Sequence, residues 1–184
     1  MPVAPETLRR TGGRQLQSVV FDAKQIADRV SRLGQDITSA FPEGELMVLG
    51  LLKGSFIFMG DLVRQIERPL QVDFVVASSY GRDTISSGNV QLLYDPETEL
   101  EGKHLLLVED IVDSGTTLRK LLGILDKRHP RSLAVCALLD KELMHEPMPE
   151  LRFVGFKAPE AFLVGYGLDH AEDFRHLPFI ADLM

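Results

Sequence analysis

Cysteine is almost missing from this sequence: Cys136 is the only one among 184 residues, and there is no tryptophan. A single cysteine cannot form an internal disulfide. Because Cys136 lies in the apolar run 133–139, we interpret it as an unreactive core residue rather than a reactive thiol. Apolar stretches such as 46–52 are far shorter than the roughly 20 residues of a membrane-spanning helix. The basic N-terminal segment is not followed by the apolar stretch of a secretory signal. We therefore expect a soluble cytoplasmic protein that does not bind membranes.

An excess of positive charge is also lacking, because 20 Lys and Arg stand against 27 Asp and Glu, which gives a formal net charge of -7. Nonspecific nucleic-acid binding requires cations that neutralise phosphates, so we expect no nucleic-acid partner. Neither repeats nor low-complexity stretches divide the chain. Its composition, 45% apolar and 26% charged, is that of a globular protein of one core. We expect a single domain over residues 1–184, with residues 1–15 as a flexible arm.

Hydrophobic periodicity predicts helices between strands. Apolar residues recur at spacings of three and four in residues 26–41, which predicts a helix that begins at Asp22 and ends before Pro42. Further helices are expected over 56–66 and 116–128, and strands over 45–52, 72–80, 89–94, 104–108 and 132–139. This alternation predicts an α/β fold with a mainly parallel, twisted sheet flanked by helices. We expect residues from about 142 to 184 to form a small cap, or hood, over the sheet.

Residues suited to binding a phosphate are concentrated where the strand 104–108 leads into the helix that begins at Thr116. Ligands of such sheets bind at the carboxyl ends of the strands, and the N-terminus of a helix attracts phosphate. Gly115 allows the backbone to approach a ligand closely, while Ser114, Thr116 and Thr117 offer hydroxyl donors. The pattern therefore predicts an anion site at this turn.

Acidic residues accompany the expected anion site. Glu109 and Asp110 precede the turn, where they can face the hydroxyls of a sugar or a metal bound to those hydroxyls. The alternative is helix capping, with Asp113 or Ser114 as the N-cap and the other acids in solvent. Capping requires only one such residue and leaves two acids at the end of an apolar strand unexplained. We therefore favour a site for a sugar phosphate.

Two other phosphate-binding motifs are absent from the sequence. No Gly-x-x-x-x-Gly-Lys-[Ser/Thr] loop occurs, because Gly102-Lys103 is followed by His104. No Gly-x-Gly-x-x-Gly follows a predicted strand. These absences argue against a P-loop NTPase and a Rossmann dehydrogenase.

Residues 108–118 resemble the motif with which type I phosphoribosyltransferases bind 5-phosphoribosyl-1-diphosphate (PRPP). That motif is an apolar strand, two acids, a turn with a further Asp, and Ser/Thr-Gly-x-Thr. Other segments resemble the hypoxanthine-guanine subgroup of this family: residues 52–55, residues 79–81 with Thr84 and 86–88, Lys141, residues 162–169 and residues 174–175. The resemblance extends over roughly residues 18–183.

The resemblance implies a Mg²⁺-dependent purine salvage enzyme that joins hypoxanthine or guanine to PRPP and releases diphosphate. It implies that Asp113 is the catalytic base near purine N7. It implies PRPP ribose and phosphate contacts at Glu109, Asp110, Ser114, Gly115, Thr116 and Thr117, and diphosphate contacts at Lys53, Gly54 and Arg175. Ser79 and Tyr80 would begin the flexible loop that closes over the reaction, and Lys141, Phe162 and Leu163 would bind the purine. Metal ligands are expected at Asp169, Glu109 and Asp110.

Several alternatives remain open from the sequence. Phe162 could belong to the core, and Lys141 could be an ordinary surface lysine. Arg175 could do no more than pair with Asp173 or Glu172. The enzyme could prefer xanthine, or the chain could be a regulator that senses PRPP without catalysis. The resemblance implies a homodimer or homotetramer. The balance between hypoxanthine and guanine and the isomer of the Leu52–Lys53 peptide, often cis in the family, are not determined by the sequence.

Overall fold

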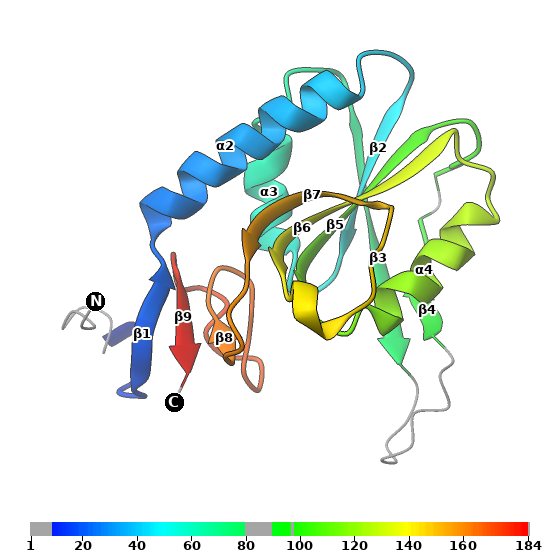
Figure 1. The fold of residues 1–184 in the computed structure, drawn as a ribbon. Coiled ribbons are helices and arrows are strands. Elements are labelled where there is room, and N and C mark those ends of the chain that lie inside the picture. Colours follow the sequence, from blue (N-terminus) through cyan, green and yellow to red (C-terminus); the bar gives the residue numbers. More distant parts are fainter. Residues whose placement is uncertain (1–8, 80–89, 97, 184) are drawn as a thin grey trace.

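A mainly parallel sheet forms the centre of the computed structural model, which describes residues 9–79, 90–96 and 98–183 (Figure 1). Its six strands have the order β4-β3-β2-β5-β6-β7. They are β2 (Leu46–Leu51), β3 (Gln71–Ser79), β4 (Val90–Tyr94), β5 (His104–Val112), β6 (Ser132–Asp140) and β7 (Leu151–Lys157). Only β4 runs antiparallel to its neighbour. The expected α/β fold is confirmed.

Helices cover both faces of this sheet. The helices α2 (Ala23–Ala40) and α3 (Phe56–Val63) lie on one face, and α4 (Thr116–Asp126) lies on the other (Figure 1). Alternate residues of β5 point to opposite faces, so that Leu106 packs with the cluster that includes α2 and α3, and Leu105 with the cluster that includes α4. Among the described residues no helix is long and apolar enough to cross a membrane.

The helix α2 begins where the sequence predicts. The Asp22 carboxylate accepts a hydrogen bond from the Gln25 backbone N–H at 2.8 Å, and the Gln25 side chain accepts one from the Asp22 N–H at 2.9 Å. This reciprocal pair is a capping box, which satisfies two backbone donors that would otherwise lack partners. The buried face of α2 carries the predicted apolar residues: Ile26, Val30, Leu33 and Ile37.

The strand β5 is longer than predicted. It extends to Val112 instead of ending at residue 108, because β6 runs beside it as far as the pair Val112 and Asp140. The carboxylates of Glu109 and Asp110 therefore project from the strand itself and not from the following loop. The predicted helices 56–66 and 116–128 each end two or three residues earlier, at Val63 and Asp126.

A second, antiparallel sheet with the order β1-β9-β8 lies beside the central one (Figure 1). Its strands are β1 (Leu16–Phe21), β8 (Leu163–Val164) and β9 (Ile180–Leu183). We call it the small sheet. The strand β1 was not anticipated, because its partner β9 comes from the other end of the described chain. Next to β1, Arg14 forms an ion pair with Asp173 and its guanidinium lies 4.4 Å from the centre of the Phe174 ring.

Candidate active site

The turn between β5 and α4 forms a small hollow. We call residues 109–117 the phosphate turn. All of them except Asp110 line a cavity of about 180 Å³ at the carboxyl end of β5, and Leu51 and Leu118 complete its wall. Gly115 is the N-cap of α4 and has a φ of 67°, in the left-handed region that favours glycine. The backbone therefore turns sharply at the point where a phosphate is expected.

The hydroxyls of the phosphate turn face one another. Ser114 Oγ donates to Thr116 Oγ1 at 3.2 Å, and Ser114 Oγ is also 3.5 Å from the Thr116 backbone nitrogen. Neither Asp113 nor Ser114 is the N-cap, since Gly115 occupies that position. The alternative of simple helix capping is therefore wrong. Exposed hydroxyls at a helix N-terminus suit an anion.

The loop of residues 52–55, which we call the first loop, lies against Asp110. A Cβ placed on Gly54 would be 1.6 Å from Asp110 Oδ2, so this position has room only for glycine. Asp110 Oδ1 accepts a hydrogen bond from the Ile111 backbone N–H at 2.9 Å. The peptide between Leu52 and Lys53, whose isomer was open from the sequence, is cis. The structure thus places Gly54, which is expected to bind diphosphate, beside Asp110, which is expected to bind ribose.

Glu109 is the acid whose protonation is most perturbed at this turn. Burial raises the pKa of Glu109 well above its usual value, and the hydrogen bond and the charge of neighbouring Asp110 raise it further. A backbone hydrogen bond from Asp110 opposes the shift. A protonated carboxyl donates as well as accepts, so the pair can bind hydroxyl groups, whereas a nearby cation would favour ionisation.

Asp113 and Lys141 come together across the ends of two neighbouring strands. The ammonium of Lys141 lies 3.2 Å from Asp113 Oδ2, and the Lys141 side chain is only 18% exposed. The Lys141 backbone N–H donates to the Val112 carbonyl at 2.9 Å, which fixes the lysine at the end of β5. Lys141 is therefore not an ordinary surface lysine. It places a cation beside the expected general base.

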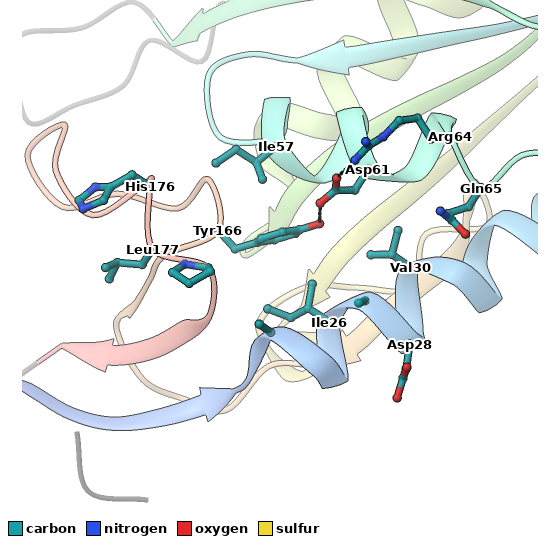
Figure 2. Close-up of a pocket in the computed structure, with 13 residues that line it drawn as sticks. Ile26, Asp28, Val30, Ile57, Asp61, Arg64, Gln65, Tyr166, His176 and Leu177 are labelled. Atoms are coloured by element: carbon teal, nitrogen blue, oxygen red, sulfur yellow. Dashed lines mark hydrogen bonds and ion pairs between the residues drawn. The ribbon is translucent and has the colours of Figure 1, made fainter. Parts of the chain in front are cut away.

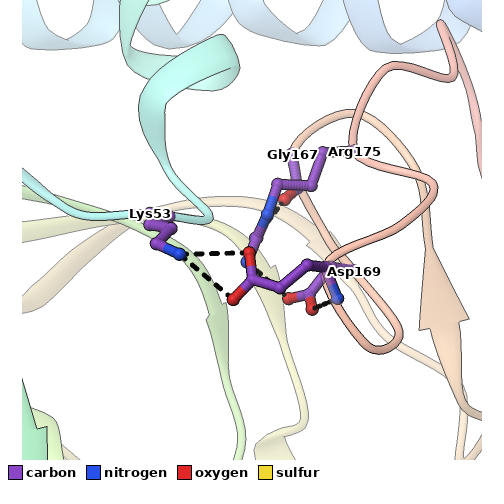
Figure 3. A network of polar contacts seen from close by, with 5 residues as sticks. Lys53, Gly167, Asp169 and Arg175 are labelled. Carbon is purple, nitrogen blue, oxygen red and sulfur yellow. Dashed lines mark hydrogen bonds and ion pairs between the residues drawn. The ribbon is translucent and has the colours of Figure 1, made fainter.

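A network of charges joins the first loop to residues 167–175 (Figure 3). Lys53 binds both carboxylate oxygens of Glu172 at 3.1 Å. Arg175 lies 2.8 Å from Asp169 Oδ1 and 3.4 Å from Glu172 Oε2, and it donates to the Gly167 carbonyl at 2.7 Å. The two cations expected to bind diphosphate thus share one carboxylate, that of Glu172. Those interactions lower the pKa of Glu172, led by the hydrogen bond from Lys53.

The aromatic ring of Phe162 is open to solvent. It is 54% exposed and contacts His170 edge to face, with the ring centres 5.4 Å apart. The alternative of a core phenylalanine is therefore wrong. Leu163 is buried in β8, and the backbone N–H of Leu183 binds the Phe162 carbonyl at 2.9 Å. The small sheet holds the backbone of these residues while about half of Phe162 stays exposed.

The expected flexible loop lies largely outside what the structure describes, and the expected metal ligands lie within it. Tyr80 and the polar segment that follows it are outside the described residues, and the side chain of Ser79 is as well. Within the described ranges, no three His, Cys, Asp or Glu side chains gather as an all-protein metal site requires. Asp169 instead pairs with Arg175 and accepts a hydrogen bond from the Glu172 backbone N–H at 2.9 Å.

Sequence reasoning missed two contacts at the site. One is the ion pair between Lys53 and Glu172. The pairing of Arg175 with Glu172 was among the alternatives and is present, whereas Asp173 pairs with Arg14 instead. The other is a pair of side chains, Asp140 and His145, that closes the loop after β6 with a distance of 2.7 Å. No local pattern connects Lys53 with Glu172, because the two residues are 119 positions apart in the sequence. No local pattern indicates that His145 folds back onto β6.

A further hollow of about 690 Å³ lies between α2, α3 and the segment that carries Tyr166 and residues 176–178 (Figure 2). It contains none of the expected site residues. Figure 2 shows the Tyr166 hydroxyl pointing at Asp61 on α3, to which it donates a hydrogen bond of 2.7 Å. Burial raises the pKa of Tyr166, and the hydrogen bond to Asp61 raises it further, so this phenol keeps its proton. The hollow is separate from the phosphate turn.

Comparison with known proteins agrees with this geometry. The model of the phosphoribosyl transferase domain family matches residues 17–171. Two curated relatives are the hypoxanthine phosphoribosyltransferase of Salmonella typhimurium, 44% identical, and the hypoxanthine-guanine phosphoribosyltransferase of Bacillus subtilis, 40% identical. The alignments cover 90% and 91% of this chain and 94% and 93% of the relatives. A crystal structure of a hypoxanthine-guanine phosphoribosyltransferase from Bacillus anthracis is 39% identical, with a TM-score of 0.87 over 92% of this chain and all of that one.

A parallel sheet with a glycine-containing turn between the carboxyl end of a central strand and a helix is typical of enzymes that bind phosphorylated ligands. The chain belongs to the phosphoribosyltransferase family. The relatives that resemble it over most of their length carry the names of hypoxanthine and hypoxanthine-guanine phosphoribosyltransferases.

Proposed function

We propose that this enzyme transfers the phosphoribosyl group of PRPP to N9 of hypoxanthine or guanine and releases diphosphate, as a step of purine salvage. The pairing of Lys141 with Asp113 beside the phosphate turn carries this proposal. A cation next to a carboxylate can donate to the 6-oxo group of a purine while the carboxylate accepts a proton at N7. The names of the relatives support the same reaction.

A hydrogen bond from the Lys141 ammonium to the purine would explain why 6-oxopurines are preferred over adenine. An adenine would present a 6-amino group to the lysine and leave a donor facing a donor. A buried polar group without a partner costs roughly 1–3 kcal/mol, which favours 6-oxopurines by about ten- to a hundredfold. Phe162 would stack on the base with its exposed face, and Leu163 would offer backbone groups to the edge of the base.

On the phosphoribosyl side, the amides and hydroxyls of residues 114–117 would hold the 5'-phosphate. Glu109 and Asp110 would bind the ribose hydroxyls and stabilise the positive charge that develops on the sugar as diphosphate leaves. Lys53, Gly54 and Arg175 would bind the diphosphate, which requires that both cations release Glu172. Asp113 would take up the proton of the purine as the new bond forms.

The family generally requires a divalent metal, and we infer that it is Mg²⁺. Mg²⁺ prefers oxygen ligands and keeps several waters, so it suits a site with few protein carboxylates and many substrate oxygens. The adjacent carboxyls of Glu109 and Asp110 fit such a site, and Asp169 would join through water. When bound, the metal would neutralise charge on the diphosphate.

We also infer a cytoplasmic homodimer or homotetramer, from the resemblance to the family. A buried, unpaired Cys136 agrees with a reducing compartment.

A diphosphate-release assay with PRPP, Mg²⁺ and a panel of purines tests the proposed function. We expect turnover with hypoxanthine and guanine and little with adenine. A clear preference for xanthine would replace the proposed base specificity. Release with none of the purines would contradict the transferase activity and favour a PRPP-sensing regulator, for which a gel-shift with cellular nucleic acid is the next measurement.

A further inference from the structure

The loop that follows β6 is closed by a buried pair of side chains. After Asp140, the last residue of β6, the chain forms the short helix η1 (Glu142–Met144), and His145 then folds back onto the strand. His145 Nε2 lies 2.7 Å from Asp140 Oδ1. The two side chains are only 4% and 11% exposed. Neither residue touches the substrates in the proposed function, and yet both are held in a defined geometry.

The hydrogen bonds of His145 indicate how many protons its ring carries. Nδ1 lies 2.9 Å from the backbone carbonyl oxygen of Glu146, and Nε2 faces the Asp140 carboxylate. A carbonyl and an ionised carboxylate can only accept, so both ring nitrogens must donate for both contacts to be hydrogen bonds. A neutral imidazole has one N–H and would leave a nitrogen lone pair facing an oxygen. The geometry therefore fits the charged imidazolium.

This clasp of His145, Asp140 and Glu146 lies against the phosphate turn. A Cβ on Gly115 would be 3.2 Å from Met148 Cε and 3.6 Å from His145 Cβ, so the loop borders the glycine. Arg119 of α4 donates from Nη2 to the same Glu146 carbonyl at 2.6 Å. The clasp thus ties the loop to the helix whose N-terminus forms the anion site.

The other end of the loop carries Lys141. Its backbone N–H binds the Val112 carbonyl, and its own carbonyl accepts from the Met144 N–H at 2.8 Å. The position of Lys141 beside Asp113 therefore depends on how the loop between Asp140 and His145 is closed. Opening the clasp would loosen the loop that follows Lys141 and the contact of that loop with Gly115.

We propose that His145 is a positioning residue for phosphoribosyl transfer, which in its doubly protonated form ties Asp140 to the Glu146 carbonyl and so holds Lys141 and the Gly115 backbone in their binding positions. Loss of one proton from the ring leaves one of these two hydrogen bonds without a donor, which loosens the clasp and weakens the binding of purine and PRPP. The proposal rests on the proposed function, because those are the ligands whose affinities it concerns.

The charges around His145 determine the direction of its titration. Asp140 and, at longer range, Glu142 favour the imidazolium, while Arg119 disfavours it. Burial lowers the pKa of His145, but the hydrogen bonds to the Glu146 carbonyl and to Asp140, together with the charge of Asp140, outweigh burial and Arg119 and raise it above the usual value. A raised pKa means that the clasp is complete below about pH 6.5 and opens as the pH rises through the pKa of the folded protein.

Kinetics over a range of pH test this role. The KM for hypoxanthine and the dissociation constant of PRPP, the latter from calorimetry, are measured from about pH 6 to about pH 9 for the unmodified enzyme and for His145→Arg. We expect both constants of the unmodified enzyme to rise about tenfold through the titration and those of His145→Arg, whose charge is permanent, to change less. Titration of the substrates themselves affects both proteins equally.

The control is His129→Asn. His129 is exposed and has a φ of 52°, which Asn tolerates, so this variant should keep the pH profile of the unmodified enzyme. Identical profiles for the Arg variant and the unmodified enzyme would overturn the proposal.

A spectroscopic measurement decides the protonation without any turnover. ¹⁵N chemical shifts of the His145 ring, assigned by their loss in His145→Gln, should show two protonated nitrogens at pH values where an exposed histidine has already lost one proton. A neutral ring at about pH 6.5 would overturn the proposal even if the Arg variant failed to fold. Absence of diphosphate release with every purine would instead contradict the proposed function, so the two failures are distinguishable.

Discussion

The carboxylate of Asp110 occupies the space where a side chain on Gly54 would begin, since a Cβ there would lie 1.6 Å from Oδ2. Two segments far apart in the sequence therefore pack so closely at the site that no additional carbon atom fits between them. In Gly54→Ala the carboxylate must move and give up its hydrogen bond to the Ile111 N–H, which is worth about 1 kcal/mol. We expect the PRPP dissociation constant, measured by calorimetry, to rise about tenfold or more.

The matched control for this change is Gly60→Ala. Gly60 is exposed within α3, and a Cβ there would meet nothing within 4 Å. Alanine in a helix interior is favoured over glycine by roughly 0.5–1 kcal/mol, so this variant should unfold at a higher urea concentration and bind PRPP as before. Equal PRPP affinity of the two variants would contradict the role assigned to the contact between Gly54 and Asp110.

Removing the negative charge of Asp113 should separate binding from turnover. Asp113→Asn keeps the shape of the side chain but cannot accept a proton from the purine, and a general base contributes roughly 10²- to 10⁴-fold to a rate. We expect kcat to fall by about that factor while PRPP affinity changes little. Steady-state kinetics and calorimetry measure the two quantities. Asp126→Asn, an exposed acid at the end of α4, is the control, and full activity in Asp113→Asn would refute the assignment of the base.

Neutralising Glu172 should strengthen the binding of diphosphate. In Glu172→Gln, Lys53 and Arg175 no longer share a carboxylate with the incoming anion. Solvent and salt screen an exposed ion pair strongly, so product inhibition by diphosphate should become at most about fivefold stronger, and less so at high salt. Asp28→Asn, which removes the exposed ion pair with Lys24, should leave the inhibition constant unchanged. Weaker inhibition in Glu172→Gln would show that the carboxylate helps binding.

Cys136 should be inert in the folded enzyme. Its side chain is fully buried, and burial raises the pKa of the thiol, so little thiolate is present at neutral or mildly alkaline pH. We expect iodoacetamide to label the native protein very slowly and the urea-unfolded protein at the rate of a free cysteine. Mass spectrometry after timed quenching measures both rates. Rapid labelling of the native protein without loss of activity would contradict the interpretation of a core residue.

The parts of the molecule that could be predicted from sequence are those that depend on neighbouring residues. Asp22 with its Gln25 partner begins α2, and the spacing of the apolar residues defines its buried face. The phosphate turn is one contiguous segment, so its residue types and the strand and helix on either side of it could be predicted together.

The parts that could not be predicted depend on long-range contacts. The length of β5 follows from pairing with β6 up to Asp140, and the pairing of β1 with β9 joins residues from opposite ends of the described chain. The fold of His145 onto Asp140 follows from the course of a short irregular loop. Sequence spacing carries no information about which side chains such a loop brings together.

The order of the strands along the chain has a consequence for synthesis on the ribosome. All six strands of the central sheet are encoded between β1 and β9, so that sheet can assemble while β1 has no partner. β8 depends on the same partner, because β9 lies between β1 and β8. The backbone around Phe162 is therefore fixed only after β9 has emerged. A nascent chain arrested before β9 should have a folded phosphate turn, but the residues expected to bind the purine should not yet be in place.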